Sequence, residues 1–179
     1  MISANEDLKA LVRTISDFPK PGIQFRDITT LLLDRDGFFD TIERLADSVV
    51  ERPDLIAAIE ARGFIVGAAL AARLGCGLLL IRKDGKLPGE TIAEDYALEY
   101  GSDRLHMHVD ACAPGASVLL ADDLIASGGT ALAAARLVRR AGGLVTHARF
   151  VIDLPELGGA EALRAEGIAV ESLVSFEGA

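Results

Sequence analysis

Two kinds of hydrophobic periodicity alternate along the chain. Apolar residues recur at helical spacing over 8–15 and again over 38–49, which predicts two helices. Further helices are expected where small and apolar residues follow apolar runs, at 63–74, 129–141 and 158–166. The short helix at 158–166 is the last of these before the C-terminal run.

Short apolar runs between these helices predict strands. The runs lie at 54–59, 77–81, 118–121, 143–154 and 168–176. In a sheet with one face in water, apolar and polar residues alternate along each strand. These runs do not alternate in this way, which is typical of strands that are buried on both faces. Because strands and helices alternate, we predict an α/β fold with a mostly parallel, twisted, doubly wound sheet flanked by helices.

Two segments break this alternation. Two prolines and a glycine at 19–22 forbid helix and favour an extended, exposed path. The segment 84–95 shows no sustained period, and a loop of that length in a compact domain is usually a lid or a binding loop. After it, 96–100 and 105–109 alternate and could pair as a hairpin.

Length and charge limit the classes of protein to consider. A chain of 179 residues is about one domain, so we expect a single domain over 1–179. The formal net charge of −9 argues against a general nucleic-acid binder, because such proteins neutralise phosphates with Lys and Arg. Any phosphate site must therefore be local.

The sequence also favours a cytoplasmic location. Cys76 and Cys112 form no CxxC pattern or Cys/His cluster, so we expect neither a disulfide framework nor a zinc site. The acidic N-terminal segment lacks the basic and apolar regions of a secretion signal. The longest apolar stretches fall far below the roughly 20 residues of a membrane helix, so we expect a soluble protein without membrane contact.

One strand end carries candidate chemistry. The apolar run 118–121 is followed by Asp122 and Asp123, and then by Ala126-Ser127-Gly128-Gly129-Thr130 at the start of a helix. Small residues let successive N–H groups point inward, and the helix N-terminus adds partial positive charge, so this segment could bind a phosphate. The alternative is an ordinary helix cap by Ser127 or Thr130.

The paired aspartates favour a particular phosphate ligand. Two carboxylates beside a phosphate would repel it unless hydroxyl groups or a cation lie between them. A ribose diol or Mg2+ would satisfy Asp122 and Asp123, which indicates a sugar phosphate. The chain has neither the G-x-x-x-x-G-K-[ST] pattern nor a G-x-G-x-x-G after a strand, which argues against the common nucleotide motifs.

At this point the chain resembles a known family. The stretch 120–130 is similar to the 5-phospho-α-D-ribose 1-diphosphate (PRPP) motif of type I phosphoribosyltransferases. Asp-Phe-Pro-Lys-Pro-Gly and Phe-Arg-Asp within 17–27, Glu-Ala-Arg-Gly-Phe at 60–64, and the segment 82–91 leading to Leu-Glu-Tyr-Gly resemble the adenine phosphoribosyltransferases. The resemblance implies a type I phosphoribosyltransferase-like fold with a small hood near 16–34 and 154–179 and a flexible lid loop at 82–101.

The resemblance also implies a reaction, in which adenine and PRPP give AMP and diphosphate with Mg2+ in purine salvage. By this likeness the backbone and hydroxyls of Ala126, Ser127, Gly128, Gly129 and Thr130 would hold the 5′-phosphate. Asp122 and Asp123 would face the ribose and, directly or through water, the metal. The family more often has Thr where this chain has Ser127.

Four cations are the implied ligands of the diphosphate: Arg62, Arg82, Lys83 and Lys86. Arginine suits this task because its planar fork matches phosphate oxygens. For Arg82 and Lys83 the alternative is a solvated strand end. In similar proteins an arginine at the base of the lid reaches the neighbouring subunit, so the resemblance implies a homodimer.

Glu99 resembles the family's catalytic carboxylate, which would manage a proton of the purine ring. Its alternative is an exposed charge on a hairpin. Tyr100 would close over the site as part of the lid, or would pack on the sheet. Lid closure would exclude water during the reaction.

Gln24, Phe25 and Arg26 are the candidates for binding the base. Phe25 offers an aromatic face, and the backbone around it can offer a carbonyl to the amino group of adenine. A 6-oxopurine would need a donor instead, and no lysine follows Lys86 to provide one. The alternative for Phe25 is a place in the core. A transferase for hypoxanthine, guanine or xanthine, or a PRPP-sensing regulator, remains as an alternative function.

Overall fold

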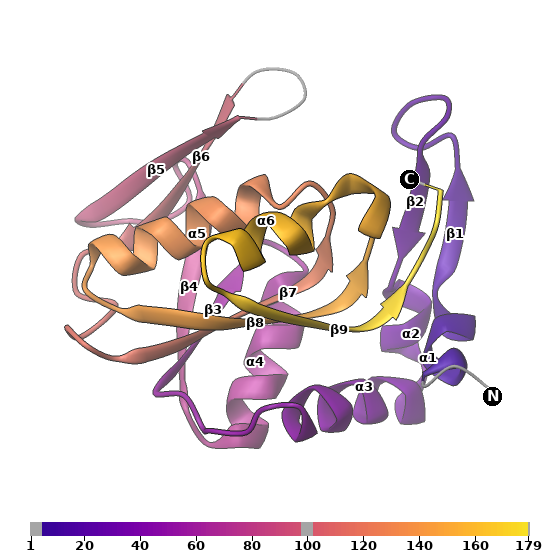
Figure 1. Ribbon diagram of the computed structural model, residues 1–179, viewed down its shortest axis with the longest axis horizontal. Coiled ribbons are helices and arrows are strands. Elements are labelled where there is room, and N and C mark those ends of the chain that lie inside the picture. The colour runs from indigo at the N-terminus through magenta and orange to yellow at the C-terminus, as the bar shows by residue number, and fades with distance from the viewer. Residues whose placement is uncertain (1–4, 98–101, 179) are drawn as a thin grey trace.

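The computed structural model describes residues 5–97 and 102–178. Helices lie on both faces of a central sheet (Figure 1). The strands are β1 Arg13–Ser16, β2 Gln24–Asp27, β3 Leu55–Ile59, β4 Gly77–Lys83, β5 Thr91–Ala97, β6 Ser102–His108, β7 Ser117–Ile125, β8 Leu144–Asp153 and β9 Ala169–Ser175. The helices are α1 Glu6–Leu11, α2 Thr29–Leu33, α3 Arg35–Asp47, α4 Gly63–Leu74, α5 Gly129–Arg140 and α6 Gly159–Ala165, with a 3-10 turn at Pro155–Leu157.

Most strands of the central sheet run parallel. Among the described residues, seven strands form this sheet in the order β5-β6-β4-β3-β7-β8-β9. The five strands from β4 to β9 pair in parallel, while β5 and β6 form an antiparallel hairpin attached to the end of β4. The predicted α/β fold with a mostly parallel sheet and flanking helices is confirmed.

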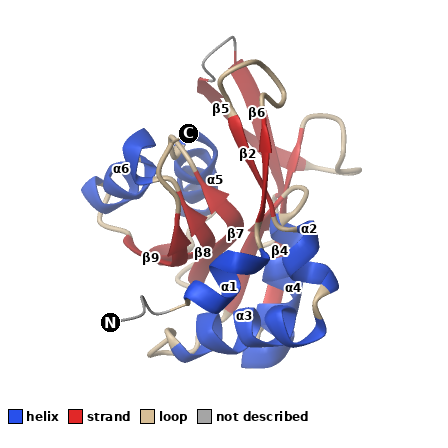
Figure 2. Ribbon diagram, turned by 90° about the vertical axis from the view of Figure 1, so that its right-hand side faces the viewer, coloured by secondary structure: helices blue, strands red, loops and turns tan. Residues whose placement is uncertain are grey.

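Alternate residues of the central strands bury their side chains in two separate cores. Ala57 and Ile59 of β3 face the core that contains α5 and α6, whereas Ile56 faces the core that contains α1, α3 and α4. Figure 2 shows these two groups of helices on opposite sides of the sheet. The helix α4 can approach β3 closely because Gly67 has no side chain. A Cβ added at Gly67 would lie 2.5 Å from the Cβ of Ala58.

Two antiparallel ribbons rise from the same side of the sheet at its opposite ends. One is the β5–β6 hairpin and the other is formed by β1 and β2 (Figures 1 and 2). The C-terminal segment lies beside β2, because the guanidinium of Arg26 donates hydrogen bonds to the carbonyls of Glu177 and Gly178 at 2.8 Å each. The two regions proposed as a hood, 16–34 and 154–179, therefore meet at Arg26.

Three local predictions differ from the structure. The first helix ends at Leu11, and Ile15 lies in β1 opposite Phe25, because pairing with β2 overrides the helical spacing. The short helix α2 was not predicted. The acidic pair Asp122 and Asp123 lies within β7, which continues to Ile125, and does not follow the strand.

The segment 84–95 is less irregular than its sequence indicates. Its second half enters β5, which pairs with β6 from Thr91 onward. Tyr96 is 8% exposed and Ile92 packs against the core beside α5, so burial stabilises a strand that lacks an apolar run. The predicted hairpin exists, but it begins earlier than expected.

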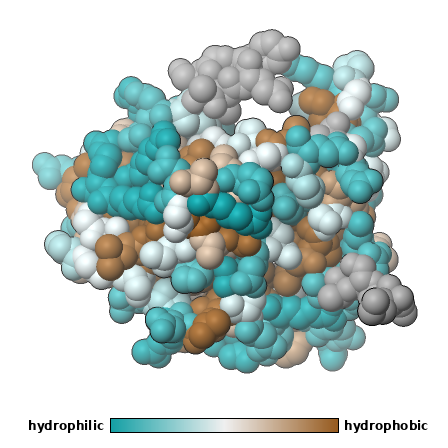
Figure 3. Space-filling view, in the orientation of Figure 1, coloured by the Kyte–Doolittle hydropathy of each residue, from teal (hydrophilic) through white to brown (hydrophobic). Residues whose placement is uncertain are grey.

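Polar residues cover much of the face that carries α5 and α6, with apolar residues between them (Figure 3). Within residues 5–97 and 102–178, no helix combines the length and apolarity needed to cross a bilayer.

Candidate active site

The turn between β7 and α5 forms a backbone cradle from residues 126–130. Gly128 has a positive φ of 82°, a conformation that glycine adopts without steric cost. A Cβ at Gly128 would lie 2.9 Å from the Cα of Gly159, so the start of α6 supports the cradle from behind. The N–H of Gly159 also donates to the carbonyl of Ala126 at 2.9 Å. The cradle is therefore fixed by close backbone contacts.

The N–H groups of this cradle suit an anion. The N-cap of α5 is Gly128, which makes no side-chain cap among the described residues. The first N–H groups of a helix have no intrahelical acceptor, so those of Gly129 and Thr130 are available to a ligand. The helix macrodipole adds partial positive charge at the same point. Ser127 is exposed beside them.

Asp122 and Asp123 point to opposite sides of β7. Asp122 reaches the start of α4, where a Cβ added at Gly63 would lie 2.4 Å from the carboxylate oxygen Oδ1. Burial and, next, the charge of Asp123 raise the pKa of Asp122 well above its ordinary value. Asp123 is 5% exposed and its Oδ2 lies 2.7 Å from Nε of Arg62. The two acids thus differ in environment despite being adjacent.

Arg62 links the acidic pair to an aromatic side chain. Its guanidinium lies 5.1 Å from the ring centroid of Phe25, on the β1–β2 ribbon. The ring of Phe18 meets Phe25 edge-on at 5.1 Å and fixes its orientation. The same guanidinium therefore contacts the candidate ribose acid Asp123 and the candidate base platform Phe25.

Two of the other cations, Arg82 and Lys83, are also held by carboxylates. Nε of Arg82 donates to Glu60 at 3.1 Å, and the backbone N–H of Lys83 donates to the same oxygen. Arg82 also donates to the carbonyl of Lys86 at 2.9 Å, which joins the end of β4 to the turn after it. The ammonium of Lys83 lies 3.1 Å from Oδ2 of Asp103.

A cavity of about 500 Å3 brings most of these groups together. It lies at the carboxyl ends of β3 and β7, where ligands bind in open α/β sheets. Its wall includes these predicted site residues: Arg62, Lys83, Asp122, Asp123, Ala126, Ser127, Gly128, Gly129 and Thr130.

The remaining predicted residues that the structure describes lie outside this wall. Phe25 contacts the wall residue Arg62, and Arg82 donates a hydrogen bond to the wall residue Glu60. The guanidinium of Arg26 binds the hydroxyl of Thr14 and the C-terminal carbonyls, so its side chain is engaged in the hood. The Gln24 amide accepts a hydrogen bond from Ser16, and Lys86 lies on the turn before β5. Glu99 and Tyr100 lie outside the described residues.

Sequence reasoning assigned no role to Glu60, Tyr96 or Asp103. Glu60 and Tyr96 line the cavity, and Asp103 contacts both Tyr96 and Lys83. Glu60 stands beside Arg62 in the motif at 60–64, which was a usable signal. Asp103 is found only from the pairing of β5 with β6, which places it opposite Tyr96.

The acidic pair fits Mg2+ in one manner. Within 5–97 and 102–178 no group of three or more His, Cys, Asp or Glu side chains could hold a metal ion. Mg2+ commonly uses one or two carboxylates and takes its other oxygens from substrate phosphates and water. Asp122 and Asp123 supply those carboxylates next to the cradle, so the residues present fit a metal that arrives with a phosphorylated substrate.

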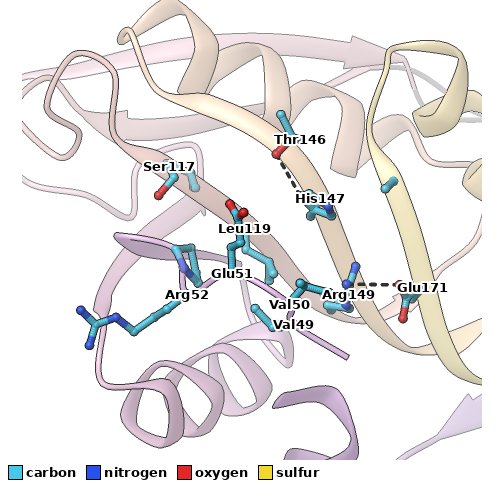
Figure 4. A pocket seen from close by; sticks show the side chains of 13 residues that line it. Val49, Val50, Glu51, Arg52, Ser117, Leu119, Thr146, His147, Arg149 and Glu171 are labelled. Carbon is cyan, nitrogen blue, oxygen red and sulfur yellow. Dashed lines mark hydrogen bonds and ion pairs between the residues drawn. The ribbon is translucent and has the colours of Figure 1, made fainter. Parts of the chain in front are cut away.

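A second cavity of about 400 Å3 lies at the amino-terminal ends of the strands (Figure 4). Arg149 in its wall is 2% exposed, lies 3.3 Å from Glu171 and donates to the carbonyl of Ser48, the C-cap of α3. A cation at this position stabilises a helix end. This cavity lies at the amino-terminal ends of the strands, whereas Asp122 lies near the carboxyl end of β7, so the cavity is separate from the candidate site.

Comparison with known proteins identifies similar sequences and structures. The model of the phosphoribosyl transferase domain matches residues 29–160. Adenine phosphoribosyltransferases of Sphingopyxis alaskensis and Erythrobacter litoralis are 57% and 58% identical, over 96% and 97% of this chain and 94% and 98% of theirs. The adenine phosphoribosyltransferase structure from Thermoanaerobacter pseudethanolicus has a TM-score of 0.91 and 48% identity, covering 96% of this chain and 99% of that one. That from Saccharomyces cerevisiae, complexed with an imino-altritol bisphosphate and adenine, has a TM-score of 0.87 and 33% identity, covering 97% and 100%.

Proposed function

This chain belongs to the adenine phosphoribosyltransferase family, and we propose that it transfers the phosphoribosyl group of PRPP to adenine, giving AMP and diphosphate in purine salvage. The observation that carries the proposal is the cradle 126–130 beside Asp122 and Asp123 in one cavity. Amides for a phosphate and acids for a diol or metal match the two ends of a ribose 5-phosphate.

Binding of PRPP would begin at the cradle. The N–H groups of Gly129 and Thr130 would hold the 5′-phosphate, with Ala126, Gly128 and the hydroxyl of Ser127 completing the cradle. Asp122 and Asp123 would then accept hydrogen bonds from the ribose hydroxyls. Because the cradle is fixed by backbone contacts with Gly159, it would hold the sugar in place while the bond at its anomeric carbon breaks.

The departing diphosphate requires cations. Arg62 and Lys83 lie in the cavity wall, and Arg82 and Lys86 lie just beyond it, so all four would face the diphosphate. Mg2+, held by Asp122 and Asp123 directly or through water, would supply positive charge that stabilises the leaving diphosphate. These groups counter the negative charge that develops as the leaving group departs.

Adenine would bind against the ring of Phe25. The guanidinium of Arg62 lies over a face of this ring, 5.1 Å from its centroid. When the diphosphate draws Arg62 away, that face becomes available for stacking. A backbone carbonyl near Gln24 or Arg26 would accept a hydrogen bond from the adenine amino group, and Glu99 would manage the ring-nitrogen proton, with Tyr100 closing over the site.

We also propose a homodimer in the cytoplasm. Three large apolar side chains of α4 and β4 are partly exposed, namely Ile65 at 44%, Leu78 at 39% and Leu80 at 38%. Such a surface suits a second copy of the chain. Light scattering would show twice the chain mass of 18.9 kDa if this proposal holds.

The test of the function is a mass-resolved assay for nucleotide formed from PRPP and each purine in turn. We expect AMP from adenine, dependent on Mg2+, and little product from hypoxanthine, guanine or xanthine. Preferred turnover of another purine would favour the alternative transferase. PRPP binding without any nucleotide formation would favour a regulatory protein.

A further inference from the structure

A line of polar contacts joins Tyr96 in the cavity wall to Lys83 at the end of β4. Tyr96 and Thr130 both line the cavity, and the Tyr96 hydroxyl donates to Oδ2 of Asp103 at 3.0 Å. The ammonium of Lys83 lies 3.1 Å from the same oxygen. The other oxygen of Asp103 accepts the backbone N–H of Arg104 at 2.8 Å. Asp103 is thus the junction between the cavity wall and a cation proposed for the diphosphate.

The pairing of the hairpin explains why Asp103 can take this place. Tyr96 and Asp103 are directly opposite in the β5–β6 register, so their side chains share one face of the hairpin. The next pair, Asp95 and Arg104, forms an ion pair at 2.6 Å with both side chains mostly exposed, at 66% and 51%. Successive strand residues point to opposite faces. Asp95 therefore carries the same charge as Asp103 and lies on the same hairpin, but its side chain points to the face opposite Tyr96.

Both members of the Lys83–Asp103 contact are charged at neutral pH. The N–H of Arg104 and then Lys83 lower the pKa of Asp103, and Asp103 raises the pKa of Lys83. The side chain of Lys83 is 52% exposed, so little else packs around its flexible stem. An ammonium has three donors, and one bound to Asp103 leaves two for a ligand.

We propose that Asp103 is a positioning residue for the transfer reaction, because its carboxylate holds Lys83 and Tyr96 at the cavity wall where Lys83 meets the diphosphate of PRPP. This inference rests on the proposed function. Asp103 itself does not line the cavity and acts through Lys83. A lysine that is already oriented loses less rotamer freedom when the substrate binds, so Asp103 lowers the concentration of PRPP needed for half-saturation.

The experiment measures the KM for PRPP, the KM for adenine and kcat in four variants and a control. Asp103→Asn keeps the shape and the acceptor for Tyr96 but removes the charge. We expect it to raise the KM for PRPP about fivefold, the upper end for a partly exposed ion pair, and to leave the KM for adenine unchanged. Asp103→Glu should restore most of the PRPP affinity. Asp95→Asn, the matched control, should behave as the native chain.

A double-mutant cycle tests whether Asp103 acts through Lys83. Lys83→Met should itself raise the KM for PRPP, and Asp103→Asn should add nothing to it in the double variant. Three results would overturn the proposal: an unchanged KM in Asp103→Asn, equal effects of Asp95→Asn, or additive effects in the double variant. If Asp103→Asn does not fold, Asp103→Glu and Lys83→Met still form the comparison.

Calorimetric titration with PRPP alone separates this inference from the proposed function. An affinity for PRPP that depends on Asp103 and Lys83 in the same cycle, with no AMP formed by the native chain, would support the positioning role and contradict the transferase. AMP formation with a PRPP affinity independent of Asp103 would support the transferase and contradict the positioning role of Asp103.

Discussion

The two halves of the candidate site are built in different ways. The phosphate half comes from one continuous stretch, 122–130, in which backbone amides and two acids are fixed by β7, α5 and the contact of Gly128 with Gly159. The diphosphate half gathers cations from separate segments. There Arg62 and Lys83 are paired with carboxylates of Asp123 and Asp103.

Because of this difference, we expect the two halves to respond differently when PRPP binds. An amide cradle would need no rearrangement on binding, because its donors are already fixed by the backbone. A cation that contacts a carboxylate must share or exchange that partner when a diphosphate arrives. We therefore expect the phosphate half to depend on backbone geometry, and the diphosphate half to depend on side-chain charge that can be redistributed.

The largest effect is expected from breaking the cradle with Gly128→Ala. A Cβ there would require a positive φ at a non-glycine residue and would meet the backbone of Gly159 at 2.9 Å. We expect AMP formation to fall at least about a hundredfold and the free energy of unfolding to drop by about 2 kcal/mol. Measurements are steady-state kinetics and urea denaturation.

Gly115→Ala is the matched control, because Gly115 has a φ of 81° with nothing within 4 Å of an added Cβ. It carries the same conformational strain without the contact and without a place in the site. Native activity in Gly115→Ala together with native activity in Gly128→Ala would contradict the rigid cradle.

Asp122→Asn should weaken PRPP binding while it stabilises the free protein. Burial, followed by the charge of Asp123, holds the pKa of Asp122 above its unfolded value. Its stabilising contribution is thus full below the unfolded pKa and is lost as pH rises through the folded pKa. We expect the Asn variant to gain about 1 kcal/mol at pH 7 and to bind PRPP about thirtyfold more weakly.

Thermal melts from pH 4 to 8 and calorimetric titrations with PRPP check both effects. Asp110→Asn removes a charge from an exposed turn and should change neither quantity. An Asp122→Asn protein that is less stable at neutral pH, or that binds PRPP normally, would remove Asp122 from the phosphate half. Changing both Asp122 and Asp123 to Asn should abolish PRPP binding.

The contrast between the halves also explains what the sequence could predict. The cradle was predictable because small residues follow an apolar run, a local pattern. Its support by Gly159 was not, since that contact joins positions about thirty residues apart and depends on the packing of α6. The types of cation were predictable from the motifs, but their carboxylate partners depend on strand register, as for Lys83 and Asp103.

The candidate adenine-binding residues show that adjacent residues of a strand need not share a role. Gln24, Phe25 and Arg26 were proposed together, yet neighbouring side chains on a strand point to opposite faces. Phe25 meets Arg62, whereas the guanidinium of Arg26 binds the C-terminal carbonyls. Any contact of Arg26 with a base would therefore come from its backbone.

Glu60→Gln is expected to have a moderate effect on the diphosphate half. The Glu60 carboxylate accepts hydrogen bonds from Nε of Arg82 and from the N–H of Lys83. Removing its charge loosens Arg82 but retains an acceptor, so the KM for PRPP should rise about threefold with little change in kcat. Glu90→Gln, at an exposed position before β5, should match the native chain. An unchanged KM in Glu60→Gln would show that Arg82 is held without Glu60.

The smallest effect is expected from Ser127→Ala, which tests whether amides or hydroxyls dominate in the cradle. Ser127 is exposed. Losing one hydroxyl should raise the KM for PRPP only about twofold to fourfold, far less than the effect of Gly128→Ala, and Ser127→Thr should retain native kinetics. If Ser127→Ala lost as much activity as Gly128→Ala, the hydroxyl would be the principal ligand. The phosphate half would then depend on side chains, as the diphosphate half does.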